Sequence, residues 1–126
     1  MKKFLSVTLF ALTLVIASGA AIADSVIAAY NCELKEGKKA ADVQGINSKW
    51  LAAVRKNVNE DIHSSMGTAI VGDFETFLFV DTYPDLNTWA ATQTWLESDA
   101  ANELENMFDE TAKCTKNRLW RFKDTK

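Results

Sequence analysis

The sequence predicts an α+β fold in the order β-α-β-β-α-β, with a four-stranded antiparallel sheet and helices on one face. Four stretches alternate as strands do, and helical periodicity follows the first and third of them. The central stretch, Thr76 to Trp89, begins as a strand that is apolar on both faces and passes through the only proline, Pro84, into a helix. A strand of that kind must be covered on both sides, and the other elements are expected to supply the cover.

The first strand is predicted over Val26–Leu34 and the first helix from Ala40 to about Asn57, with a turn at Gly37 between them. Alternation places Tyr30 and Cys32 on one face of the strand, and Ile27 and Ala29 on the other. The helix is expected to bury an apolar stripe formed by Val43, Ile46, Trp50 and Val54.

The second strand is predicted over Ser64–Gly72, and a hairpin turn at Gly72–Asp73 joins it to the central strand. On the central strand, Phe77 and Phe79 share one face, whereas Leu78 and Val80 share the other. The last strand is predicted over Lys116–Lys123, with Trp120 as a core residue.

Two helical stripes follow Pro84, and they predict one broken helix or two helices in succession, with Asp85 and Ser98 as caps. The stripes are Leu86, Trp89, Gln93 and Leu96, then Ala100, Leu104, Phe108 and Thr111. Trp95 falls about 180° from Leu86 around the helix, at ~100° per residue. It is therefore expected at an interface or pocket, unless the helix bends there to bury it.

Residues 1–23 are predicted to be a cleaved export signal, which leaves one domain over residues 24–126 in the periplasm or secreted. Lys2 and Lys3 precede an apolar run from Phe4 to Ile16, and small residues end the segment at Ala21-Ile22-Ala23. The run is shorter than the ~20 residues of a membrane-spanning helix, so we expect no membrane contact after cleavage. Without Lys2 and Lys3, the 14 basic residues become 12 against 17 acidic ones, a balance that disfavours nucleic acid as a partner.

The two cysteines, Cys32 and Cys114, predict one structural disulfide in an exported chain. The element order is that of the split βαβ, or ferredoxin-like, fold, whose usual strand order 4-1-3-2 places the first and last strands side by side. If Cys32 lies opposite Cys114, then Val26 faces Trp120 and Ala28 faces Arg118. A metal pair is the alternative, and it needs more ligands than the single histidine, His63, supplies.

The layout resembles the dimeric α/β-barrel superfamily, which includes antibiotic-biosynthesis monooxygenases, haem-degrading monooxygenases and stress-responsive barrel proteins. The resemblance covers nearly all of residues 24–126 and rests on topology and on two patches, Y-N-C-E-L-K-E-G-K (Tyr30–Lys38) and F-V-D-T-Y-P-D-L-N-T-W (Phe79–Trp89). Small exported members without an assigned activity are the most similar. Haem-degrading members use an Asn, a Trp and a His. Only the Asn has a match, Asn31. No haem and no metal are expected, because one histidine, no thiolate pair and no paired-carboxylate spacing leave too few ligands, and no cofactor is assigned.

The candidate ligand-binding residues are Tyr30, Asn31, Trp95 and Arg118. The three on strands are the only strand residues placed to supply a polar group in an otherwise apolar pocket, and the sequence leaves open whether they face the helices or the opposite face of the sheet. No catalytic residue and no metal ligand is assigned. The acidic residues from Glu97 to Glu110 lack the spacing of a calcium loop and are expected to form a solvated face.

These patterns favour an exported, non-catalytic homodimer that binds a small apolar or aromatic molecule or serves as an interaction module. The alternative is a cofactor-free monooxygenase-like enzyme acting on such a molecule, which the resemblance implies by analogy. A homodimer is predicted because one chain's helices cover only one face of the sheet, and a second sheet would cover the other. Within a monomer, the segment from Ser98 to Lys113 or the chain ends would have to cover that face instead.

Overall fold

The computed structural model describes residues 24–123 and residue 125, so the predicted export signal lies outside the described residues. The elements follow one another as β1 (Val26–Leu34), α1 (Ala40–Asn57), β2 (His63–Thr68), β3 (Thr76–Tyr83), α2 (Leu86–Leu96), α3 (Asp99–Thr111) and β4 (Ala112–Arg121). The predicted bounds of β1 and α1 are confirmed, and the segment after Pro84 forms two helices.

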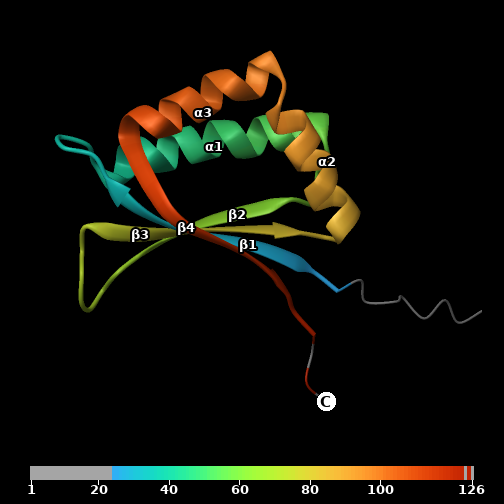
Figure 1. Cartoon of the computed structure of the whole chain (residues 1–126), viewed down its shortest axis with the longest axis horizontal. Helices are drawn as coiled ribbons and strands as arrows, with labels where there is room; N and C mark the ends of the chain where they lie inside the picture. Colours follow the sequence, from blue (N-terminus) through green and yellow to red (C-terminus); the bar gives the residue numbers. More distant parts are fainter. Residues whose placement is uncertain (1–23, 124, 126) are drawn as a thin grey trace, which may run out of the picture.

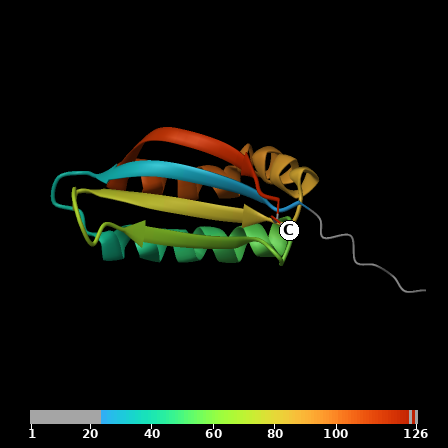
Figure 2. The same ribbon diagram turned by 90° about the horizontal axis from the view of Figure 1, so that it is seen from below.

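The four strands form one antiparallel sheet in the order β2-β3-β1-β4, which confirms the predicted ferredoxin-like arrangement. All three helices lie on one side of the sheet (Figure 1). Seen from below, the four strands lie in front of the helices, so no helix covers that face (Figure 2). This uncovered side is called the open face below.

Local capping explains where the helices begin. The Lys39 N–H donates to the Asp42 carboxylate at 2.8 Å, and the Thr88 N–H donates to Asp85 at 2.7 Å. Ser98 accepts from the Ala101 N–H at 3.3 Å and starts a new helix after the break that separates α3 from α2. No helix of the described part of the chain is long and apolar enough to cross a membrane.

The core lies between the helices and the sheet, in two clusters. One is formed by Val26, Ala28, Trp50, Val54, Ile62 and Tyr83, the other by Cys32, Val43, Phe77, Phe79 and Ala112. Of the stripe predicted for α2, Leu86 is exposed, whereas Trp89 packs against the core and Gln93 and Leu96 line the space between sheet and helices. The most buried residues of α2 are instead Thr88 and Thr92. The Thr92 hydroxyl donates to the Thr88 carbonyl at 3.0 Å, so this polar side chain is satisfied within its own helix.

β2 is shorter than predicted and ends at Thr68, and the chain then forms a loop from residue 69 to 75. Gly72 adopts φ +98° there, which fits the predicted turn. Ile70, Val71 and Phe74 of this loop are 92%, 87% and 70% exposed. The loop projects from the sheet away from the helices, at the left of Figure 1.

The disulfide between Cys32 and Cys114 is present, with the two Cα atoms 3.9 Å apart. β4, however, begins at Ala112, and a bulge beside Cys32 adds one residue to it. Val26 therefore faces Arg121 and Ala28 faces Leu119, so the register predicted beyond the bulge is wrong by one residue. A one-residue slip exchanges the two faces of a strand. Trp120, predicted in the core, lies opposite Ile27 and is 47% exposed.

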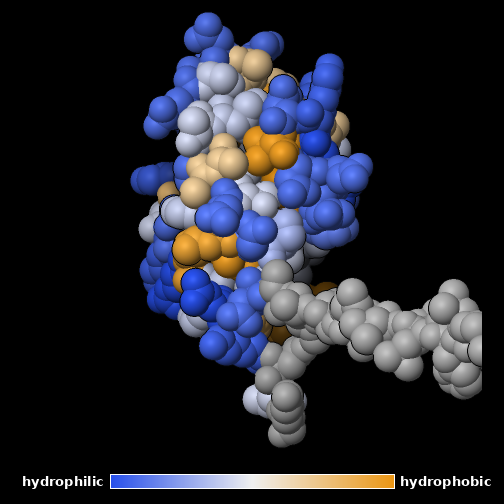
Figure 3. All heavy atoms as spheres, turned by 90° about the vertical axis from the view of Figure 1, so that its right-hand side faces the viewer, coloured by the Kyte–Doolittle hydropathy of each residue, from blue (hydrophilic) through white to orange (hydrophobic). Residues whose placement is uncertain are grey.

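The surface at the α2 end of the molecule is mostly hydrophilic, with small separate apolar patches (Figure 3). The large apolar side chains that are exposed belong mainly to the β2–β3 loop and to β4 with the residue after it: Ile70, Val71, Phe74, Leu119, Trp120 and Phe122.

Candidate functional site

A cavity of about 640 Å³ lies between the helix-covered face of the sheet and the helices. Its volume falls within the range of small-molecule sites. Its aromatic lining consists of Tyr30 from β1, Trp50 from α1, Phe79 from β3 and Phe108 from α3. The Phe79 and Phe108 rings meet edge to face at 5.5 Å, so the sheet and α3 form an aromatic corner.

The polar centre of the cavity is Asp81, whose side chain is only 7% exposed. Alternation along β3 directs Asp81 toward the helices, together with Phe77, Phe79 and Tyr83. The Ser64 hydroxyl, on the neighbouring β2, donates to Asp81 Oδ1 at 2.5 Å. Asn47 Nδ2, on α1, donates to the Ser64 oxygen at 2.9 Å. Three elements thus hold the carboxyl group in place.

Burial raises the pKa of Asp81 to about 6. The hydrogen bond from Ser64 opposes this change, and the nearby Glu105 carboxylate adds to it. The Asp81 carboxyl therefore exchanges its proton in the range where a group is useful as an acid or base near neutral pH.

The second carboxyl oxygen of Asp81 is open to the cavity. Oδ1 accepts the Ser64 hydrogen bond, whereas Oδ2 has no hydrogen-bond partner among the described residues. No buried side-chain oxygen or nitrogen of those residues is left without a partner. Oδ2 is therefore not sealed in the core, and because Asp81 lines the cavity, a ligand can reach this oxygen there.

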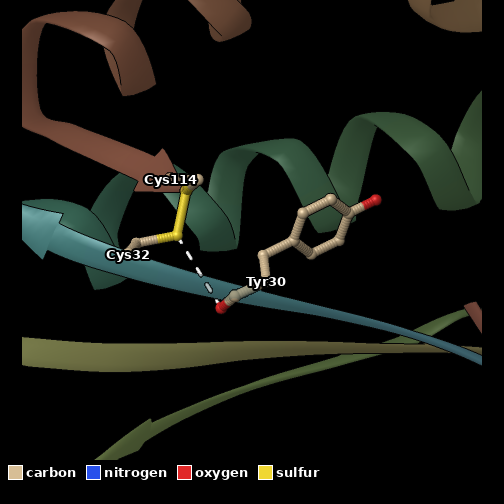
Figure 4. Close-up of a disulfide and its surroundings, with 3 residues drawn as sticks. All are labelled: Tyr30, Cys32 and Cys114. Atoms are coloured by element: carbon tan, nitrogen blue, oxygen red, sulfur yellow. Dashed lines mark hydrogen bonds between the residues drawn. A yellow bond between two sulfur atoms is a disulfide. The ribbon is translucent and has the colours of Figure 1, made fainter. Parts of the chain in front are cut away.

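Tyr30 is the one predicted site residue that the structure places in this cavity. Its side chain leaves β1 on the same face as the Cys32–Cys114 disulfide, and its hydroxyl points away from the disulfide (Figure 4). Burial first, then the charges of Asp81 and Glu105, raises the pKa of Tyr30 to about 12. The phenol therefore stays neutral at physiological pH and can donate a hydrogen bond.

Glu105 is the acidic residue of α3 that borders the cavity beside Asp109. Burial and the neighbouring Asp109 raise the pKa of Glu105. These two residues belong to the acidic stretch that was predicted to form a solvated face. Both are exposed to solvent, as predicted, but they also contribute to the cavity lining.

The other predicted site residues do not join Tyr30. Asn31 and Arg118 lie on the open face, since they pair with Lys116 and Ala29 respectively on the side opposite to Tyr30. Asn31 borders a second hollow of about 500 Å³ there, next to Gly67 and Leu78. Trp95 is partly buried and packs against the core cluster of Val54 and Ile62 rather than lining the cavity.

Sequence reasoning missed Asp81, Ser64, Asn47 and Glu105, although two signals were present. The turn predicted at Gly72–Asp73 centres the hairpin so that Ser64 pairs with Asp81, as it does in the structure. The alternation that groups Phe77 with Phe79 extends to Asp81, which places a carboxylate on an apolar strand face. A charged residue in such a position is rare unless it has partners or a function.

His63 lies away from this cavity, and its exposed ring Nδ1 is 3.0 Å from an Arg55 guanidinium nitrogen. Within the residues that the structure describes, no group of three or more His, Cys, Asp or Glu side chains is arranged to hold a metal ion.

No protein-family model matches the chain, and no curated protein matches it. Solved structures do match its fold. SnoaB, a cofactor-independent oxygenase from Streptomyces nogalater, is similar with a TM-score of 0.62 and 10% identity, over 82% of this chain and 97% of that one. A conserved protein from Bacteroides thetaiotaomicron, described as a possible oxidoreductase, gives 0.59 and 12% identity, over 79% and 98%. An uncharacterised NIPSNAP-like domain protein from Burkholderia xenovorans gives 0.56 and 10% identity, over 81% and 86%. At these identities the likeness shows the fold alone, and it agrees with the predicted β-α-β-β-α-β arrangement around a four-stranded antiparallel sheet.

Proposed function

We propose that this protein is an exported homodimer that binds a small aromatic or apolar molecule in the cavity between sheet and helices. The observation that carries the proposal is the cavity itself, in which four aromatic side chains lie beside several polar ones, among them the fixed carboxyl group of Asp81. Aromatic side chains combined with polar groups that are held in fixed positions can provide both the contact area and the orientation that a small-molecule site needs.

A binding role without chemistry is favoured by how the polar groups are used. The Ser64 hydroxyl donates to Asp81 and accepts from Asn47, so it is tied into a chain that positions the carboxyl group. A serine nucleophile requires a base that takes its proton together with a group that orients the base. Asn47 orients the serine rather than the carboxylate, which makes the chain better suited to anchoring a ligand.

Native mass spectrometry of the purified protein tests this function, because it reports bound small molecules and oligomeric state together. We expect a dimer that retains a small molecule or takes up an added aromatic one. A matched pair of variants locates the site: Phe108→Ala enlarges the cavity and should weaken retention, whereas Phe74→Ala, in the exposed loop, should not. Binding that is equal in both variants would contradict the proposed site.

The homodimer is supported by the open face of the sheet. Ile27 and Ala29 of β1 and Leu78 and Val80 of β3 lie there without helical cover. The segment that forms α3 does not cover it, since α3 lies with the other helices (Figures 1 and 2). A second sheet packed on this face would bury these side chains, and two-fold symmetry is the commonest way to supply one.

Sedimentation analysis at micromolar concentration tests the dimer. The Val80→Asp variant places a charge in the centre of the open face and should sediment as a monomer, while Ala52→Asp, on the exposed side of α1, should remain dimeric. A monomeric wild-type protein would contradict the dimer without affecting the cavity.

Export is supported by the signal-like pattern of residues 1–23 and by the Cys32–Cys114 disulfide, which persists in oxidising compartments. We therefore place the protein in the periplasm or outside the cell. Fractionation of expressing cells should recover a chain that begins at Asp24, and recovery of the intact chain in the cytoplasm would contradict this placement.

Cofactor-free oxygenation is the second candidate, and Asp81 is the observation that favours it. Its open Oδ2 and its pKa of about 6 suit a base that removes a proton from an acidic phenol, with molecular oxygen as the oxidant. An oxygen electrode distinguishes the two functions. Oxygen uptake with dihydroxyaromatic compounds that Asp81→Asn abolishes would establish the enzyme, and binding of the same compounds without uptake would exclude this reaction for them.

A further inference from the structure

We propose that the cavity selects a positively charged ligand, an aromatic amine whose ammonium group binds Asp81 while its ring packs against the aromatic walls. This inference rests on the small-ligand function proposed above and adds the charge of the ligand to it. Three features of the cavity carry it: the balance of charges around it, the open oxygen of Asp81 and the aromatic lining.

The charges around the cavity are mainly negative. Asp81 lines it from β3, and Glu105 and Asp109 line it from α3, whereas Lys116 of β4 is the one basic residue of its lining among the described residues. Outside the lining, the Lys35 ammonium group donates to the Asp109 backbone carbonyl. An anionic ligand would be repelled by these carboxyl groups, and the repulsion by Asp81 is weakly screened because that side chain is buried. A cation would be attracted by the same groups.

Asp81 provides a specific contact for that cation. Its side chain is more than nine-tenths buried, and Oδ1 is already bound by Ser64. Oδ2 lacks a partner among the described residues and faces the cavity, so an ammonium group placed there would complete the hydrogen bonding of the carboxylate. Charge-assisted hydrogen bonds of this type are the stronger ones. A buried carboxylate without a counter-charge is costly, and a cationic ligand would remove that cost.

The aromatic walls favour the same class of ligand. Tyr30, Trp50, Phe79 and Phe108 all line the cavity, and the face of an aromatic ring attracts cations. The ring of an aromatic amine would also pack on these side chains through apolar contact. Aromatic surface and carboxylate together fit a ligand that is apolar at one end and cationic at the other.

Three indole compounds of similar size test the charge separately from the ring: tryptamine is a cation, tryptophol is neutral and indole-3-acetate is an anion at neutral pH. Isothermal titration calorimetry of the purified protein, buffered at about pH 7.5, should rank their affinities in that order, with tryptamine binding most tightly. We expect tryptamine to bind at least about tenfold more tightly than tryptophol, which corresponds to about 1.4 kcal/mol. Indole-3-acetate should bind more weakly than either.

Variants then assign the effect to the carboxylate. Asp81→Asn keeps the shape and the Ser64 contact, so it should reduce tryptamine affinity about tenfold, to the level of tryptophol. Glu105→Gln should reduce it less, because that side chain lies at the border of the cavity. Asp61→Asn, an exposed residue in the α1–β2 connection, should change nothing.

Equal binding of tryptamine and tryptophol to the wild-type protein would overturn the selection for a cation while leaving the small-ligand function in place. A preference for tryptamine that Asp81→Asn does not alter would overturn the role of Asp81. Failure of all three compounds to bind at millimolar concentration would overturn both the ligand class and the proposed function.

Discussion

Replacing Asp81 by asparagine should stabilise the fold at neutral and alkaline pH but not in mild acid. In the folded protein the pKa of this carboxyl group is raised to about 6 from an ordinary value of 3.8, chiefly by burial. A raised carboxyl pKa means that the folded state binds the proton more tightly than the unfolded state. The contribution of Asp81 to stability is therefore fully present below about pH 3.8 and is lost as the pH rises through about 6.

The size of the effect follows from the two pKa values. Their difference, from 3.8 to about 6, corresponds to about 3 kcal/mol in the free energy of unfolding. Asparagine is neutral at every pH, similar in shape, and able to accept the Ser64 hydrogen bond through its Oδ1. Relative to wild type, the variant should thus gain about 3 kcal/mol between mild acid and pH 8.

Urea unfolding of both proteins at a series of pH values from about 4 to 8 measures this difference. Protein concentration is held constant, because the apparent stability of a dimer depends on it. Asp85→Asn is a control of opposite sign. The hydrogen bond from the Thr88 N–H lowers the pKa of Asp85, so its contribution is lost as the pH falls. A stability difference between Asp81→Asn and wild type that is independent of pH would refute the assignment of Asp81 as a buried, charged anchor.

Three further predictions concern the same fold. Ser64→Ala removes the hydrogen bond that lowers the pKa of Asp81, so the pKa of Asp81 in the variant should lie above about 6. In the same urea series, the pH at which the Asp81 contribution to stability is lost should then be higher in the variant than in wild type, and an unchanged or lower value would contradict the contact. Cys32→Ala combined with Cys114→Ala removes the disulfide, whose cysteines have a sequence separation of 82. The chain-entropy model predicts a loss of up to about 4.5 kcal/mol in the free energy of unfolding. Calorimetry that shows no loss of stability would mean that the disulfide does not form in the native protein. Ile62→Ala should lower the free energy of unfolding by about 2–5 kcal/mol, because Ile62 is fully buried. Ile70→Ala, in the exposed loop, should change it by less than about 0.5 kcal/mol. Similar effects of the two substitutions would contradict the core packing.

The site illustrates why function was harder to predict than fold. Asn47 and Ser64 are 17 residues apart in sequence, and so are Ser64 and Asp81. The three residues come from three different elements. None of them forms a motif, and a serine or an asparagine by itself does not indicate a site. Their hydrogen bonds exist because the β2–β3 register and the position of α1 place the three side chains together.

The sequence by itself determined the order of the elements, the bounds of β1 and α1, the capping residue Asp85 and the pairing of Cys32 with Cys114. These features depend on local periodicity, on local hydrogen bonding and on a topology that few alternatives satisfy. Tertiary structure decided the rest. The bulge beside Cys32 moved Trp120 to the open face, Thr88 and Thr92 rather than Leu86 are buried on α2, and Trp95 packs partly buried against the core. Strand register and helix rotation depend on how whole surfaces fit together, and a shift of one residue changes which side chains meet while leaving the sequence pattern the same.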